Sequence, residues 1–294
     1  MIKKGKRNGV WRFRCLSCKK NFQSKRRKSR LQNKLWKEYV CGKQTLKDLS
    51  AKHHRSKKWI KQQLDAVKIS PNNLLKPQPI VIVADVTFFS RSYGVIVTRE
   101  PNLKKNIYWK EVSTEIPDIY WQARTQIEQQ GFTLKGVVID GKRGVKEVFM
   151  DLPVQMCQFH QVAIINRYLT RKPKLAAGKE LRSISLFLTK ANEKEFTDLL
   201  DNWYGKWKYF LQEKSFNPET QKLHYTHKRL RSAYRSLKTN LPYLFTYQKY
   251  PELKIPNTTN SLDGTFSYFK TLLRIHRGMS KVKRYKAICE ILKN

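Results

Sequence analysis

The sequence predicts an α/β protein: an RNase H-like mixed sheet interrupted by an all-α insertion and preceded by small basic domains. Three observations predict it. A strongly apolar run at 80–84 opens an alternation of strand and helix patterns that lasts to about residue 168. From 170 to 250 the pattern is wholly helical. Residues 1–80 hold 24 Lys and Arg against 3 Asp and Glu, which sets them apart from the rest of the chain.

The charge of the chain indicates its partner. Lys and Arg number 61 against 22 Asp and Glu, a formal net charge of +39. Such an excess repels itself unless a polyanion neutralises it, so we expect double-stranded DNA to be bound. Hydrophobic residues make up 40% of the 294 residues, enough for one catalytic domain with a smaller appendage.

Other classes of protein are disfavoured. No apolar run approaches the roughly 20 residues of a membrane span, and the N-terminus lacks the apolar region of a secretory signal. The five cysteines are expected to be reduced thiols or metal ligands rather than disulfides. The sequence therefore predicts a cytoplasmic, nucleoid-associated protein with no membrane partner.

Residues 1–30 resemble the second half of a zinc ribbon. Cys15 and Cys18 form one knuckle between two strand-like segments. A closed structural Zn²⁺ site needs four ligands, so a first knuckle is expected before residue 1 and the site is incomplete here. The alternative is a pair of free cysteines in a turn.

Residues 31–68 are predicted to form a helix-turn-helix. Helices are expected at 31–39, at 45–53 and from Ser56 onward, with a capping box between Thr45 and Asp48. The last helix is expected to enter a major groove with Lys57, Lys58, Lys61 and Gln62. The alternative is a basic three-helix packing unit.

After the linker at 67–78, the predicted strands and helices of the catalytic domain follow one another in a definite order. Strands at 80–86, 93–98 and 106–113 form an antiparallel meander. Helix 117–130, strand 134–140, a short helix at 143–150, strand 153–157 and helix 161–169 follow. This is the order of an RNase H-like fold, in which the first strand is central and the fourth lies beside it. The predicted core is 80–168, the insertion 169–256, and the returning C-terminal helix 257–294.

Three acidic residues stand where an apolar strand ends or a helix begins: Asp85, Asp140 and Asp263. Asp85 and Asp140 are expected side by side at one edge of the sheet, with Asp263 brought over it by the returning helix. Three carboxylates suffice for two Mg²⁺ or Mn²⁺ ions, which catalyse in-line phosphoryl displacement. Each acid also has a structural alternative: a strand-end turn at Asp85, an Asp-Gly turn at Asp140, and a helix cap at Asp263.

Several motifs in this order resemble one family. They are Cys157-Gln158-Phe159-His160, Asn257-Thr258-Thr259-Asn260-Ser261-Leu262-Asp263-Gly264 and His276-Arg277-Gly278-Met279. They resemble bacterial insertion-sequence DDE transposases of the Mutator-related group, in the variant with an N-terminal zinc ribbon. The resemblance spans residues 5 to 280. It implies DNA transposition, with Asp85, Asp140 and Asp263 as the catalytic metal ligands, on element ends bound by the N-terminal domains. The family's third acid is usually Glu, whereas this chain has Asp263.

The remaining candidate residues would contact DNA. The resemblance places His160 near the active site, and Arg143, His276 and Arg277 are candidate phosphate contacts. The alternative for His160 is a capping or packing role. Cys157 ends an apolar strand and is expected in the core. Trp203 and Trp207 are expected to pack within the insertion.

Three functions remain open from the sequence. The first is a transposase that cleaves element ends and joins the 3′-hydroxyl to target DNA, acting as a homodimer on two terminal repeats. The second is a catalytically inactive DNA-binding relic of such an enzyme. The third is an RNase H-like nuclease or junction resolvase without strand transfer, which the helix-turn-helix disfavours.

Overall fold

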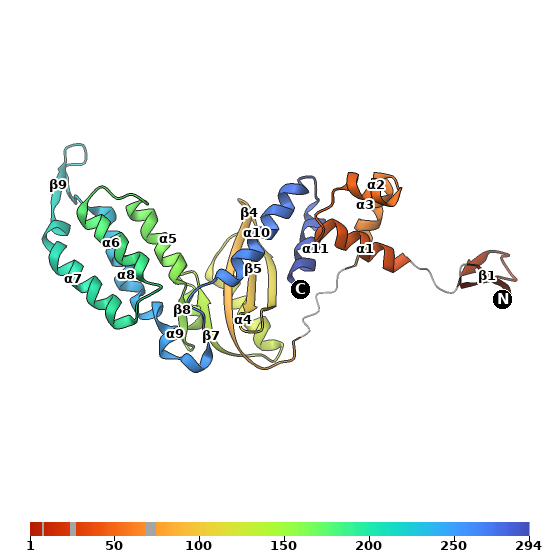
Figure 1. Ribbon diagram of the computed structural model, residues 1–294, viewed down its shortest axis with the longest axis horizontal. Helices are drawn as coiled ribbons and strands as arrows, with labels where there is room; N and C mark the ends of the chain where they lie inside the picture. Colours follow the sequence, from red (N-terminus) through yellow and green to blue (C-terminus); the bar gives the residue numbers. More distant parts are fainter. Residues whose placement is uncertain (8, 24–27, 69–74, 294) are drawn as a thin grey trace. The chain divides into compact units, whose positions relative to one another are not determined.

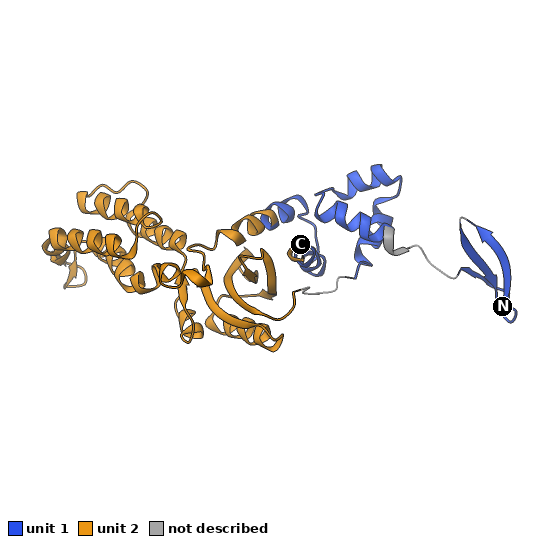
Figure 2. Cartoon of the chain, turned by 60° about the horizontal axis from the view of Figure 1, so that its bottom comes forward, with its two compact units in different colours: residues 1–71, 269–291 blue, residues 72–268, 292–294 orange. Residues whose placement is uncertain are grey.

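The computed structural model describes residues 1–7, 9–23, 28–68 and 75–293. They fall into two compact units, residues 1–71 with 269–291 (unit 1) and residues 72–268 with 292–294 (unit 2) (Figure 2). The C-terminal segment, predicted to belong wholly to the catalytic core, is divided between them. The reason is that Leu272, Met279 and Ala287 are buried in the hydrophobic core of unit 1. Half of the expected linker, residues 69–74, lies outside the described residues.

Unit 2 contains a mixed five-stranded sheet in the order β6-β5-β4-β7-β8. Its strands are β4 (Pro79–Ser90), β5 (Tyr93–Glu100), β6 (Lys105–Val112), β7 (Thr133–Ile139) and β8 (Val154–Met156). The first three are antiparallel, whereas β7 is parallel to β4 and β8 is parallel to β7. The α/β class and the central position of the first strand beside the fourth are thus confirmed, and the sheet is consistent with an RNase H-like core.

Burial explains why these segments form the centre of the sheet. Residues 80–84 of β4 and 136–139 of β7 are all buried, as expected for strands covered on both faces. Helix α4 (Pro117–Gln129) buries Tyr120, Ala123 and Ile127 in the same hydrophobic core. Pro117 stands in its first turn, where a missing N–H has no cost. The short helix predicted at 143–150 is a 3₁₀ turn, η1 (Lys146–Phe149).

A helical bundle follows β8 in the same unit (Figure 1). Its helices are α5 (Gln158–Leu169), α6 (Ala176–Phe187), α7 (Glu193–Gln212), α8 (Lys228–Leu244) and α9 (Thr246–Lys249), followed by η2 (Pro251–Leu253). The bundle has its own core, which includes Leu181, Phe196, Trp203 and Leu237. The Trp203 indole donates to the Ala177 carbonyl (3.0 Å) and the Trp207 indole to Glu180 (2.7 Å), so both tryptophans have structural partners.

The prediction that 170–250 is wholly helical is wrong at one place. Strands β9 (Lys214–Asn217) and β10 (Lys222–Tyr225) form an antiparallel hairpin with Phe216 opposite Leu223. Asn217 closes its turn, since its side-chain oxygen accepts from the Glu219 and Thr220 N–H groups (2.9 and 3.2 Å). Pro218 follows Asn217 and disfavours a helical conformation there, so α7 could not continue through this segment.

Unit 1 combines a small sheet with helices. Strands β1 (Ile2–Arg7), β2 (Val10–Arg14) and β3 (Asn21–Gln23) form an antiparallel sheet. Helices α1 (Lys28–Val40), α2 (Leu46–His53) and α3 (Lys57–Asp65) match the three predicted ones, whereas α11 (Lys281–Leu292) was not predicted. The Thr45–Asp48 capping box is confirmed, with both reciprocal hydrogen bonds present. Within the described residues, no helix combines the length and apolarity needed to cross a bilayer.

Candidate active site

The sheet register brings two of the predicted acids together. Val83 of β4 pairs with Val138 of β7, and two residues further along these parallel strands lie Asp85 and Asp140. Neighbouring strands are about 4.8 Å apart, so the two acids lie side by side. Asp85 lies inside β4 rather than at its end as predicted, because β4 continues to pair with β5 as far as Ser90. The pairing of β4 with β7, in contrast, ends at Val83.

Asp85 is a buried carboxylate with few compensating contacts. The residue is 6% exposed, and Oδ1 accepts a hydrogen bond from the Val86 N–H (2.7 Å). The pKa of Asp85 is raised to about 7, mainly by burial and also by the like charges of Asp140 and Asp263, while His160 and the Val86 hydrogen bond oppose the shift. A buried acid beside other acids is the pattern of a functional site rather than of a packing residue.

Asp140 is held by a tight turn. Its Oδ1 accepts from the Lys142 N–H (2.9 Å), as in an Asx turn. Gly141 adopts φ +84°, which favours glycine, and a Cβ there would also require the end of the Met156 side chain to move. The turn explains Asp140-Gly141 structurally, but it also fixes the half-buried Asp140 beside Asp85. The structural and functional interpretations are therefore compatible.

A cysteine and a histidine link helix α5 to the segment before α10. The buried Cys157 sulfur accepts hydrogen bonds from the Thr259 N–H (3.3 Å) and hydroxyl (3.5 Å). The Thr259 hydroxyl also lies 3.4 Å from Nδ1 of His160. The pKa of His160 is raised to about 9, mainly by the hydrogen bond to Cys157 and also by the charges of Asp85 and Asp140, while burial opposes the shift. The imidazolium therefore places a positive charge near both acids.

Asn257 is joined by hydrogen bonds to Gln158 at the start of α5, and this connection is called the tether below. The Gln158 N–H donates to the Asn257 carbonyl (2.9 Å), and the Asn257 amide donates back to Gln158 Oε1 (3.0 Å). Gln158 also donates to the Leu244 carbonyl (2.9 Å). Helix α10 (Asn260–Ile275) starts three residues after Asn257 and carries half-buried Asp263 in its first turn. The tether thus fixes the start of the helix that carries the third acid.

We expect Asn257→Ala to slow any chemistry at this site by about tenfold. It removes the donor to Oε1 of the buried Gln158 side chain, which costs roughly 1–3 kcal/mol, and it leaves only the main-chain hydrogen bond to hold the segment before α10. Denaturant unfolding and the cleavage rate of a DNA duplex measure the two effects. Asn202→Ala, at an exposed position of α7, is the control. An unchanged cleavage rate in Asn257→Ala would show that the tether does not position the site.

A fourth acid near the site was missed by the sequence interpretation. Glu115 is half-buried between β6 and α4, accepts from the Tyr120 hydroxyl (2.9 Å) and lies 3.7 Å from Lys142 Nζ. Burial raises its pKa, and the charge of Asp140 contributes. In the sequence Glu115 is an ordinary loop residue two positions before Pro117, so no spacing rule points to it. Glu252, another acid shortly before Asp263 in the chain, is exposed in η2.

Two hollows with basic side chains meet at Lys142, which is two residues after Asp140. One hollow of about 540 Å³ is lined by Arg91, Glu115 and Lys142, among others. A second, of about 300 Å³, is lined by Gly141, Lys142, Arg143 and Lys146. Arg143 is exposed, as a phosphate contact must be. The cationic side chains of these hollows suit a phosphodiester backbone, although neither Asp85 nor Asp140 lines them.

The other predicted residues lie in unit 1. Those on α3, namely Lys57, Lys58, Lys61 and Gln62, are all exposed, as is Arg277. His276 is 7% exposed, with Nε2 3.1 Å from the Tyr39 carbonyl and its ring 4.0 Å from the Tyr39 ring. Burial lowers its pKa, which favours the neutral ring. His276 is thus a packing residue, and the predicted phosphate contact at this position is wrong because the side chain points into the core.

Metal-binding geometry is incomplete at both predicted sites. Cys15 and Cys18 lie in the turn between β2 and β3, as expected for one knuckle. Across the described ranges, no group of three or more His, Cys, Asp and Glu side chains is arranged to hold a metal ion. Asp85 and Asp140 nevertheless fit Mg²⁺ chemically, because this ion is commonly held by one or two carboxylates completed by water and substrate phosphates.

Comparisons with known proteins give little guidance. No family model matches the chain, and no curated protein matches it. Among solved structures, a Drosophila P element transposase strand transfer complex aligns over 93% of this chain and 93% of that chain, with 9% identity and a TM-score of 0.37. A similarity of this size does not define a shared fold.

Proposed function

We propose that the protein is a metal-dependent DNA transposase that cleaves phosphodiesters at the ends of an element and joins the 3′-hydroxyl to target DNA. The observation that carries the proposal is the register of β4 and β7: Asp85 and Asp140 each follow the paired residues Val83 and Val138 by two positions, so a buried carboxylate lies beside a second acid. The net charge of +39 and the family resemblance of the Asn257 and Cys157 motifs support nucleic acid as the substrate.

Asp85 and Asp140 are the proposed ligands of Mg²⁺ or Mn²⁺, with Asp263 as the third. When bound, such ions activate the attacking oxygen and stabilise the leaving oxygen of an in-line displacement. Asp85 must lose its proton to serve as a ligand. His160 holds a positive charge near both carboxylates and favours the ionised form of Asp85. Lys142 and Arg143 would bind phosphate oxygens and orient the strand over the acids.

Unit 1 is proposed to recognise the element ends. The exposed residues Lys57, Lys58, Lys61 and Gln62 on α3 would enter the major groove, and Arg277 would contact phosphate. Cys15 and Cys18 would provide half of a Zn²⁺ site. Because two ends must be processed together, a homodimer on DNA is expected.

We expect Lys57→Gln/Lys61→Gln to weaken duplex binding and to lower its dependence on salt. Each lost phosphate contact removes about 0.9 from the slope of log K against log[salt], so two contacts remove about 1.8. Fluorescence anisotropy at several salt concentrations measures this slope. The control is Lys190→Gln/Lys194→Gln, a pair of exposed lysines in unit 2. Equal slopes for the two variants would exclude α3 as the recognition helix.

The experiment that tests the function is product analysis with a labelled duplex carrying the terminal repeats that flank the gene. Wild-type protein with Mg²⁺ or Mn²⁺ is expected to give 3′-hydroxyl ends and then joined strands. Cuts without joined strands would indicate a nuclease. Tight, salt-sensitive binding without cuts would contradict the enzymatic proposal.

The second candidate function is an inactive DNA-binding relic. It is favoured by the lack of a three-acid metal group in the described part of the chain, and by an aspartate at 263 that is one methylene shorter than glutamate. Asp263→Glu separates the two candidates. Cleavage by the wild type that is lost in Asp263→Asn supports the enzyme, whereas cleavage by Asp263→Glu alone identifies a relic inactivated at its third acid.

A further inference from the structure

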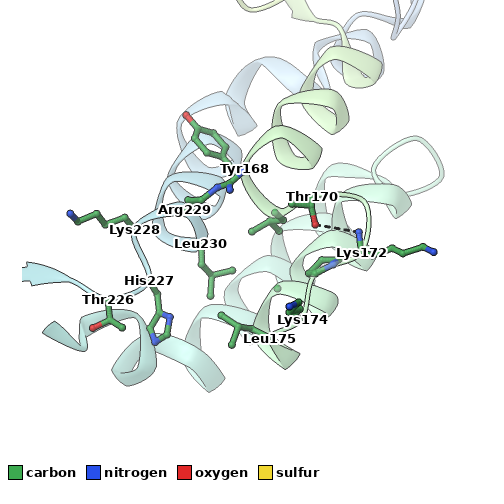
Figure 3. Close-up of a pocket in the computed structure, with 13 residues that line it drawn as sticks. Tyr168, Thr170, Lys172, Lys174, Leu175, Thr226, His227, Lys228, Arg229 and Leu230 are labelled. Atoms are coloured by element: carbon green, nitrogen blue, oxygen red, sulfur yellow. Dashed lines mark hydrogen bonds between the residues drawn. The ribbon is translucent and has the colours of Figure 1, made fainter. Parts of the chain in front are cut away.

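A pocket of about 430 Å³ lies in the helical bundle of unit 2 (Figure 3). It is formed by the end of α5, the segment that leads into α6, and the start of α8. It shares no lining residue with the two hollows that meet at Lys142. Nothing in the proposed chemistry uses it.

The floor and walls of this pocket are apolar and aromatic. Leu169, Gly178 and Leu230 are buried beneath it. The side chains of Tyr168 and Leu175 are 37% and 47% exposed. The His227 ring stacks on Phe210 at 3.8 Å between centroids, which gives the pocket a flat, fixed wall.

The rim of the pocket is cationic. The two segments that build it, 167–175 and 221–235, hold 4 and 5 Lys or Arg, which makes 9, and no Asp or Glu. Lys172, Lys174, Lys228 and Arg229 line the opening. In Figure 3 the Lys172 and Lys228 side chains extend outward on opposite sides.

Local contacts orient part of this charge and leave the rest free. Arg229 donates to the Arg167 carbonyl (2.6 Å), which holds its guanidinium at the rim. The nearby acid Glu213 pairs with His227 (3.0 Å). Within the described residues, Lys172, Lys174 and Lys228 make no salt bridge, so they are available to an anionic ligand.

We propose that this pocket binds an unpaired nucleotide of a DNA strand, with the base on the apolar floor and the flanking phosphates on the cationic rim. Sequence-tolerant binding of single strands combines these two features, a surface on which a base stacks and cations that follow the backbone. In the sequence, Arg171 and Arg235 stand in the same two segments as the lining cations. Together these cations outnumber the charges of one nucleotide, which favours a strand over a free mononucleotide.

The inference rests on the proposed function for the identity of the strand, since strand cleavage and joining expose unpaired nucleotides. It is tested without metal, so it does not depend on catalysis. The full chain is mixed in EDTA with a single-stranded oligothymidylate that carries one 5-iodouracil, and is then irradiated. Cross-linked peptides are mapped by mass spectrometry. We expect cross-links at Tyr168 or His227.

Two variants and a control refine the test. Lys174→Gln/Lys228→Gln should lower the yield of this cross-link at least fivefold and lower the salt slope of strand binding by about 1.4, or 0.7 per phosphate. Leu175→Ala, a change at an exposed position, should lower the yield and leave the salt slope unchanged. Lys190→Gln/Lys194→Gln should change neither quantity.

Three results would overturn the inference. They are cross-links confined to other parts of the chain, equal yields in the pocket variants and the control, and full competition by thymidine triphosphate at the concentration where the strand itself competes. The last result would assign the pocket to a free nucleotide. If the pocket fails but the wild type still cleaves duplex, the proposed function stands. If the pocket cross-links but no duplex is cut, the pocket stands and the enzyme fails.

Discussion

Asp85→Asn and Asp140→Asn are each expected to lower metal-dependent strand cleavage by about 10³-fold or more. A carboxylate that holds a catalytic cation contributes several kcal/mol of transition-state stabilisation, and about 4 kcal/mol corresponds to 10³ in rate. An amide of the same shape keeps the packing of β4 and β7 but removes the negative charge. Single-turnover cleavage of a labelled duplex measures the effect.

The control separates loss of chemistry from loss of fold or of DNA binding. Asp198→Asn changes an exposed acid of α7 and should retain full activity. Both active-site variants should bind duplex as tightly as the wild type. If either variant retains more than about a tenth of the wild-type rate, its carboxylate is not a metal ligand of the reaction.

Without metal, Asp85→Asn should make the protein more stable above pH 7. The pKa of Asp85 is raised from 3.8 to about 7 in the folded state, so between these values the folded protein binds more protons than the unfolded chain. Stability from this group is therefore present below pH 4 and is lost as the pH rises to 7. Asparagine removes the loss, which is on the order of 2–4 kcal/mol.

His160 should also make the folded protein less stable as the pH rises, over a higher range of pH. Its pKa is raised from 6.5 to about 9, so its contribution is complete below pH 6.5 and declines as the pH rises through 9. Urea denaturation in EDTA at pH 5 and pH 8 measures both effects. Mg²⁺ should stabilise the wild type at pH 8 but not Asp85→Asn. If Asp85→Asn is no more stable than the wild type at pH 8, then the pKa of Asp85 is not raised by burial in the folded protein.

The sheet could be predicted because its signal is local. The continuous apolar pattern at 80–84 and 136–139 requires strands buried on both faces, and the order of elements then fixes β4 beside β7. The hairpin of β9 and β10 was missed because its aromatic residues fit a helical spacing as well as a strand. The turn at Asn217 and Pro218 favours the hairpin over a helix, but it is a short-range signal inside a long helical pattern.

The site could be predicted only in part, and the reason is also physical. Asp85 and Asp140 follow from strand register, which the sequence pattern determines. Glu115 depends on how a loop folds back toward Asp140, and no periodicity encodes that. His276 stands in a basic segment and looks like a surface residue. Its burial comes from packing against Tyr39, which is 237 positions away in the chain.

The measurement that tests the central claim most directly is metal-directed cleavage of the protein itself. Fe²⁺ replaces Mg²⁺ in many oxygen-ligand sites, and with ascorbate and peroxide it cuts the nearby backbone. We predict cuts within a few residues of Asp85 and Asp140 that Mg²⁺ suppresses and that Asp85→Asn lacks. Cuts confined to the segment around Cys15 and Cys18, or scattered cuts that Mg²⁺ does not suppress, would contradict a metal site at this sheet edge.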